Sequence, residues 1–138
     1  NSKPFHTNNT GFNQFKKLKV NYITNSYDLS KVMSQTDFAI TAAGSTVFEL
    51  AHMGVPQIAF MIDENQEITG SKINEHGFGT CLGYLEDVFK DDFVNVFFEF
   101  LENTSLKTEM SSKGKKFVDG KGVDRIVEQI VQYYDLAA

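Results

Sequence analysis

Cysteine and long apolar runs are both scarce in this sequence. Cys81 is the only cysteine among 138 residues, which excludes an intramolecular disulfide and a metal site built from several cysteines. No apolar run approaches the roughly 20 residues that span a bilayer, and the first residues lack the basic and apolar blocks of a signal peptide. We therefore expect a soluble protein in a reducing, cytoplasmic setting.

Basic residues are also in short supply. The chain has 13 Lys and Arg against 18 Asp and Glu, a formal net charge of -5, which argues against a surface that binds nucleic acid through its phosphates. A nucleotide remains compatible with this charge, because a few backbone N–H groups can hold a pyrophosphate. The length fits one domain with an apolar core. The polar start, NSKPFHTNNTGF, has no Met, and we expect the chain to be a fragment of a longer protein.

Short apolar runs alternate with stretches of helical periodicity. Strands are predicted over 19–23, 37–43, 57–62 and near 80–85, and the run 37–43 is apolar enough to be buried on both faces. Helices are predicted around Leu29, Val32 and Met33, with Ser26 or Asp28 as N-cap, and over 46–53, 64–77, 91–104, 105–117 and 122–136. The alternation predicts an α/β fold with a Rossmann-like parallel sheet flanked by helices, in one domain over 1–138.

Apolar spacing predicts the buried side of the middle helices and a stripe on the last one. Val47, Leu50 and Ala51 supply this side in 46–53, and Ile68 and Ile73 supply it in 64–77. Gly54 and Gly77 follow as helix stops. The helix over 122–136 carries a regular stripe of Val123, Ile126, Val127, Ile130, Val131 and Tyr134.

The predicted helix over 91–104 is unusually rich in phenylalanine. Phe93, Phe97 and Phe100 fill one stripe, which Val94, Phe98 and Leu101 widen. A face this wide is typical of a core helix packed on both sides. It also fits a non-catalytic subunit that needs a partner chain, and this alternative stays open.

The turn Gly44-Ser45-Thr46 follows a predicted strand and opens a predicted helix. Glycine permits backbone shapes closed to other residues and lets a ligand approach closely. Ser45 and Thr46 add hydroxyls beside the free N–H groups of a helix start, and such a place suits a phosphate. In a parallel α/β sheet, ligands gather at this end of the strands.

The same turn could instead be a helix cap or a nucleophile elbow. Thr46 and Glu49 have the spacing of a capping box, which alone would explain both residues. A nucleophile elbow at Ser45 is disfavoured, because that motif needs glycine where this chain has Ala43 and Val47.

The histidines offer little support for catalysis or metal binding. His52 lies inside a predicted helix, and His6 and His76 lie in polar stretches, so a surface role is expected for each. Metal-ligand spacing is absent from the sequence. We therefore predict no metal site and no catalytic residue in this chain.

The motifs within residues 28–79 are more specific as a combined pattern than any one of them is alone. They hold an acidic residue before a strand, then AAGST, a glutamate on the next helix, GVPQI and ENQ, and DGKGVDRIV follows at 119–127. This pattern resembles the C-terminal, nucleotide-binding half of GT-B-type enzymes. The likeness is closest to the UDP-sugar hydrolases of pseudaminic acid biosynthesis and the related spore-coat polysaccharide proteins, and it covers about 19–131.

The resemblance implies a UDP site and no further cofactor. Gly44, Ser45 and Thr46 would face the diphosphate, and Glu49 would accept hydrogen bonds from the ribose. Tyr27, within the segment 25–28, would lie near the uracil. Asn65 and Gln66 would approach the sugar or the phosphates. Two alternatives stay open, since Tyr27 could be an exposed aromatic at a helix start and Asn65 could be an N-cap.

The resemblance also implies a function shared with a missing domain. In such enzymes the N-terminal domain carries the catalytic histidine. We expect that domain, and the strand–loop–helix unit that opens the C-terminal one, to lie outside this chain. We expect a hydrolase part that binds UDP or a UDP-sugar of an amino-deoxy sugar, weakly and without activity on its own. The alternatives are a glycosyltransferase donor domain and a subunit completed by another chain, including a homo-oligomer.

Overall fold

The computed structural model describes residues 23–24 and 28–137. The strand expected over 19–23 lies outside the described residues except for Ile23, which is not in a strand. Tyr27 and His6 also lie outside them. No helix in the described ranges is both long and apolar enough to cross a membrane.

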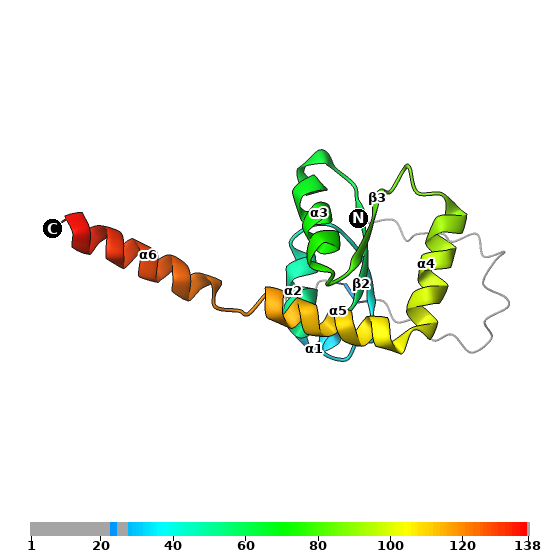
Figure 1. Cartoon of the computed structure of the whole chain (residues 1–138), viewed down its shortest axis with the longest axis horizontal. Helices are drawn as coiled ribbons and strands as arrows, with labels where there is room; N and C mark the ends of the chain where they lie inside the picture. Colours follow the sequence, from blue (N-terminus) through cyan, green and yellow to red (C-terminus); the bar gives the residue numbers. More distant parts are fainter. Residues whose placement is uncertain (1–22, 25–27, 138) are drawn as a thin grey trace.

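Three parallel strands form the sheet of the described chain. They are β1 (Ala39–Ala42), β2 (Gln57–Met61) and β3 (Thr80–Tyr84), in the order β1-β2-β3. The connections run through α2 (Thr46–Met53) and through the 3₁₀ helix η2 (Glu64–Gln66) followed by α3 (Glu67–His76). Figure 1 shows α2 and α3 together on one side of the sheet. The predicted α/β class with a parallel, Rossmann-like sheet is confirmed.

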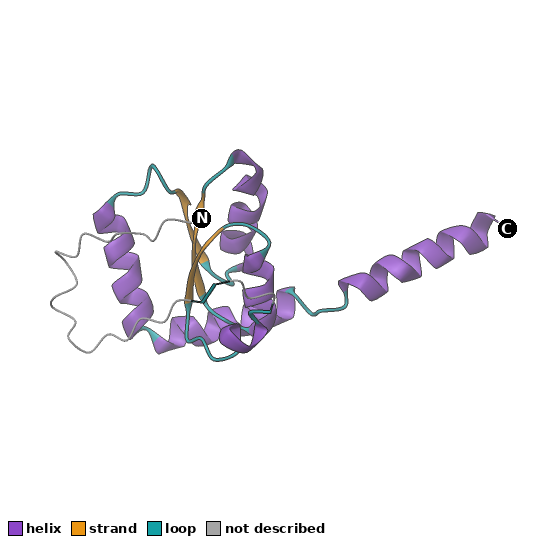
Figure 2. Cartoon of the chain, turned by 180° about the vertical axis from the view of Figure 1, so that it is seen from behind, coloured by secondary structure: helices purple, strands orange, loops and turns teal. Residues whose placement is uncertain are grey.

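The remaining helices lie in different places, and one of them covers the opposite face of the sheet. A short α1 (Ser30–Met33) precedes β1, and α4 (Lys90–Glu102), α5 (Thr104–Phe117) and α6 (Gly122–Ala137) follow β3. From behind, α4 lies on the side of the sheet away from α3, and α6 projects from the rest of the molecule (Figure 2). We use the term body for the described chain up to Val118.

The core has one apolar layer on each face of β2. On the α2 and α3 side, Ala43, Val47, Ala51, Ala59, Ile73 and Phe78 are buried together. On the α4 side, Ile58, Phe60, Phe100 and Met110 are buried together. β2 therefore has nearly every residue buried, which explains its continuous apolar sequence.

Two helix stops have the predicted form. Gly54 and Gly77 end α2 and α3 in the left-handed conformation, with φ of 72° and 65°. The N–H of Gly54 donates to Ala51 and that of Gly77 to Ile73, as expected for C-terminal caps. These two predictions are confirmed.

Two predictions of burial are wrong for particular residues. Ile40 in β1 is 49% exposed, because β1 is an edge strand of the described sheet and α4 does not cover it. Ile68 in α3 is 77% exposed, whereas Ile73 is fully buried as predicted. Around α1, where only a helix was predicted, Met33 is buried, and Leu29 and Val32 are exposed.

The helix α4 buries one face rather than two. Phe100 is buried, and the rings of Phe93 and Phe97 lie 5.7 Å apart over the same core layer. Phe98 and Leu101 point away from it and are 55% and 43% exposed. The interpretation as a core helix packed on both sides is therefore wrong for the described part of the chain.

Candidate functional site

The turn between β1 and α2 starts the helix one residue earlier than the capping box requires. Ser45 is the N-cap residue, with φ -62° and ψ -29°, and no side chain caps the helix. Thr46 is then the first helical residue, and Glu49 lies beyond the third position from which it could reach back. The capping box predicted for Thr46 and Glu49 is therefore wrong.

The polar groups of this turn are largely unused within the described chain. The N–H groups of Val47 and Phe48 donate to the carbonyls of Gly44 and Ser45, at 3.3 and 3.0 Å. The N–H groups of residues 44–46, and the hydroxyls of Ser45 and Thr46, make no hydrogen bond to another described residue. A helix N-terminus with several free donors is electrostatically suited to an anion.

Gly44 does not have the unusual backbone that the sequence suggested. It is not among the described glycines with positive φ, so that expectation is wrong. A Cβ built on Gly44 would meet only Nε2 of Gln66, at an ordinary distance of 3.9 Å. Neither conformation nor packing requires glycine here, and its lack of a side chain leaves open space at the start of α2.

Gln66 is held with its amide group toward this space. Its Oε1 accepts a hydrogen bond from the N–H of Ile62 at 3.0 Å, which leaves the NH₂ group on the side of Gly44. The structure therefore brings together Gly44 and Gln66, which follow two neighbouring strands in the sequence. Neither this bond nor the proximity to Gly44 is visible in the spacing of the sequence.

Asn65 has a different role from the one predicted. The N-cap of η2 is Asp63, whose carboxylate accepts from the N–H of Asn65 at 3.2 Å. The alternative of Asn65 as N-cap is therefore wrong. Its own side chain is exposed and makes no hydrogen bond to another described residue. The aspartate before ENQ was the signal that sequence reasoning missed.

Glu49 lies on another side of α2. It lines an open cavity of about 310 Å³ together with Asp28, Leu29, Ser30, Met33, His52 and Met53. The carboxylate of Asp28 accepts from the N–H of Ser30 at 2.8 Å, and hydrogen bonding to Ser30 lowers the pKa of Asp28. Glu49 thus lies beside the chain segment that directly follows Tyr27.

The ends of β2 and β3 form an acidic edge. A hollow of about 940 Å³ there is lined by Asp63, Glu64, Glu86 and Asp87 among other residues. The Tyr84 hydroxyl donates to Glu67 at 2.7 Å, and this bond, with burial and the neighbouring carboxylates, raises the pKa of Tyr84 to about 12. Negative charge here disfavours a phosphate, so the turn at 44–46 is the better anion site.

The described histidines have structural contacts. His52 is exposed, as predicted, and its Nδ1 lies 2.9 Å from the carbonyl oxygen of Val118. His76 is only partly exposed, and its ring stacks on Phe117 at 4.1 Å, a contact that the polar sequence around it did not suggest. In the described ranges, no group of three or more His, Cys, Asp or Glu is placed to hold a metal ion.

Comparison with known proteins gives one informative similarity. No model of a known protein family matches the chain. The chain is 27% identical over 120 residues to the spore coat polysaccharide biosynthesis protein SpsG of Bacillus subtilis (strain 168). The match supports a relationship to a polysaccharide biosynthesis family. It covers 87% of this chain but 35% of SpsG, so the chain spans about a third of the length of the curated relative it matches.

Proposed function

We propose that this chain is the UDP-sugar-binding part of a protein of polysaccharide biosynthesis. More specifically, we propose a hydrolase that releases UDP from the nucleotide of an amino-deoxy sugar. The similarity to SpsG supports the broader statement, since it runs through most of the chain. The finer statement is supported by the resemblance of residues 28–79 to UDP-sugar hydrolases and by the chemistry of the turn.

One observation carries the proposal: Gly44 leaves open space that the fold does not need. A side chain there would fit, because its Cβ would meet only the Gln66 amide at 3.9 Å. The space is bordered by the start of α2 and by the NH₂ group that Gln66 turns toward it. A phosphate group in this space would meet backbone N–H groups, two hydroxyls and a side-chain amide, all of them hydrogen-bond donors.

The same donors would assist bond cleavage. When UDP leaves a sugar, negative charge grows on the diphosphate, and fixed donors at the start of α2 would stabilise that charge. The attacking water would need a general base, which we assign to a histidine of an N-terminal domain outside this chain. Gly44, Ser45, Thr46 and Gln66 therefore bind and orient the diphosphate.

The uridine would lie on the Glu49 side of α2. The exposed carboxylate of Glu49 can accept hydrogen bonds from two ribose hydroxyls, as acidic residues do in other nucleotide sites. The cavity of about 310 Å³ beside it is at the lower limit for small-ligand sites, which fits part of a ligand rather than a whole nucleotide sugar. Tyr27 and Asn65 complete the proposed set.

The turn is tested by an isosteric charge change. In Gln66→Glu, a carboxylate oxygen can still accept from the N–H of Ile62, but the donor near Gly44 becomes a negatively charged acceptor. UDP should bind the unmodified chain weakly, with a Kd of about 1 mM, and Gln66→Glu should weaken it at least tenfold. ¹⁵N NMR titration measures both, with shifts expected at the amides of residues 44–46.

Gln129→Glu is the matched control, because it makes the same change at an exposed position on α6. It should bind UDP like the unmodified chain. Titration with inorganic pyrophosphate alongside UDP separates the two halves of the site, since Glu49→Ala should weaken UDP and leave pyrophosphate unchanged. UDP shifts that avoid residues 44–46, or equal affinities in Gln66→Glu and Gln129→Glu, would overturn the assignment.

A further inference from the structure

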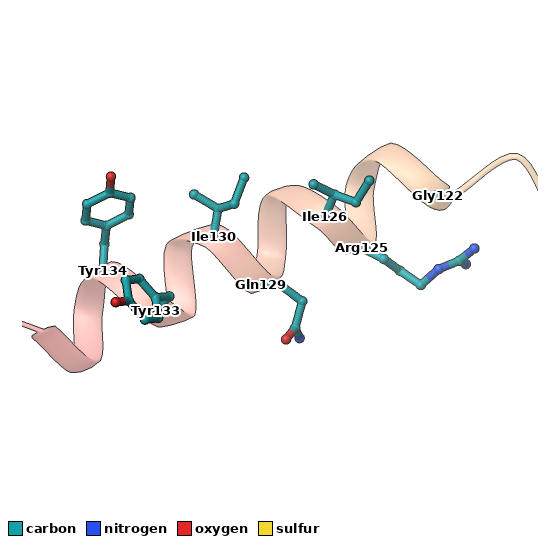
Figure 3. Close-up of a pocket in the computed structure, with 7 residues that line it drawn as sticks. All are labelled: Gly122, Arg125, Ile126, Gln129, Ile130, Tyr133 and Tyr134. Carbon is teal, nitrogen blue, oxygen red and sulfur yellow. The ribbon is translucent and has the colours of Figure 1, made fainter.

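The helix α6 holds an apolar surface that the described body does not cover. Residues 122–134 are all exposed. Figure 3 shows Ile126, Ile130 and Tyr134 along one side of the helix, with Arg125 and Gln129 along the other. We use the term α6 face for the apolar side chains Val123, Ile126, Val127, Ile130, Val131, Tyr133 and Tyr134, which are 51% to 73% exposed.

The α6 face is wide and free of charge. At about 100° per residue, its members span an arc of roughly 160° around the helix. Asp124, Arg125 and Glu128 fall on the remaining side. A helix with this pattern normally packs its apolar side on another protein surface, while the charged side stays in water. Covering the α6 face therefore requires no charge to be buried.

Specific hydrogen bonds and a close packing contact hold the start of α6 in place. Both carboxylate oxygens of Asp119 accept from the Arg125 guanidinium, at 2.7 and 3.1 Å, and one also accepts from the N–H of Lys121. The hydrogen bond to Arg125 is the main reason that the pKa of Asp119 falls to about 2. Gly120 has a φ of 76°, and a Cβ there would meet the His52 ring at 2.9 Å. These contacts direct α6 away from the body (Figure 1).

We propose that the α6 face binds the α6 face of a second copy of this chain. Its five aliphatic side chains and two tyrosines expose on the order of 700 Å². Pairing two such faces would bury up to about 1,400 Å², within the range of about 1,200–2,000 Å² found in stable interfaces. A twofold axis lets one patch serve both partners. α6 projects from the body (Figure 2), so its length is accessible to a second helix.

A lipid surface is a poorer partner for the same face. Helices that lie on membranes carry Lys and Arg on their polar side and are attracted to anionic lipids. The polar side of α6 has Asp124 and Glu128 against Arg125, so its net charge is repelled by such lipids. A protein surface is the partner that this composition favours, and the proposal is independent of nucleotide binding.

Oligomeric state provides the first test. Light scattering and sedimentation of the full chain over roughly 5 to 200 μM should give a mass rising to twice that of the monomer, because dimerisation follows mass action. The double variant Ile126→Glu with Ile130→Glu should be monomeric throughout. The matched control, Lys121→Gln with Gln132→Glu, makes the same change in net charge at exposed positions opposite the α6 face and should remain dimeric. A monomeric unmodified chain, or equal dissociation of both doubles, would overturn the proposal.

Cross-linking provides a second test that does not depend on weakening the dimer. In a Cys81→Ser background, which removes the only native thiol, Ile130→Cys places a thiol in the middle of the α6 face. Mild oxidation should give disulfide-linked dimers at least tenfold faster for Ile130→Cys than for Gln132→Cys, on the polar side. Equal rates at the two positions would contradict pairing through this face.

Discussion

Two glycines of this molecule differ in whether the packing around them requires a residue without a side chain. Gly114 lies where α5 crosses α2, and a Cβ there would meet the carbonyl oxygen and Cα of Ala51, at 2.8 and 3.1 Å. Gly44 lies at the start of α2, and a Cβ there would meet only the end of a glutamine side chain at 3.9 Å. Gly114 is explained by the packing of the body, whereas Gly44 has no explanation within the described fold.

Two asparagines repeat the contrast. The side chain of Asn74 donates to the carbonyl of Cys81 at 3.0 Å and accepts from its N–H at 2.8 Å, as a neighbouring strand would. The side chain of Asn65, beside Gln66, has no hydrogen-bond partner among the described residues. The side chain of Asn65 thus lacks the structural contacts that the side chain of Asn74 has in the body. This difference is expected where side chains serve a ligand instead of the fold.

The largest effect should come from Gly114→Ala. The added methyl group would press on the backbone of Ala51, which cannot rotate away, so α2 and α5 must separate. The higher helix propensity of alanine offsets part of this strain. We expect a net loss of about 2 kcal/mol in the free energy of unfolding, measured by urea denaturation. Gly122→Ala is the control, since nothing lies within 4 Å of its Cβ, and an equal loss there would contradict the packing argument.

Asn74→Ala should have the next largest effect. It removes two hydrogen bonds that attach α3 to β3 and leaves the N–H and C=O of Cys81 without this partner. We expect a loss of about 1 kcal/mol after the gain in helix propensity. The same denaturation experiment on Asn65→Ala should show a change below about 0.5 kcal/mol, because no bond is lost. Equal losses of unfolding free energy in the two variants would contradict the difference between Asn74, which supports the fold, and Asn65, which does not.

Local periodicity and glycine stops made the fold class predictable. Short-range sequence patterns were enough to predict two kinds of feature. These are the strands at 39–42, 57–61 and 80–84 and the helix stops at Gly54 and Gly77. Exposure was harder to predict, since Ile40 and Ile68 are apolar but lie where no element covers them. Whether a surface is covered depends on the placement of whole helices, which periodicity does not encode.

The site was predictable in its members and less so in its geometry. Gly44 and Gln66 were both chosen from motifs, but their proximity depends on a bond from the N–H of Ile62. The capping box had the right spacing and was not formed, because Ser45 already adopts helical angles. The helix begins one residue earlier than the motif requires. The exact first residue of a helix depends on the backbone conformation around the turn, which motif spacing does not determine.

The smallest effect on stability, and the most informative one, should come from Gly44→Ala. The backbone at Gly44 is open to alanine, and the new methyl group would lie at an ordinary distance from Gln66. The free energy of unfolding should change by less than about 0.5 kcal/mol, or rise slightly, because alanine restricts the unfolded chain. The methyl group would nevertheless occupy the space assigned to a phosphate, so UDP binding should weaken at least tenfold. If urea denaturation instead shows a loss above about 1 kcal/mol, Gly44 has a role in the fold, and the contrast with Gly114 no longer supports a ligand.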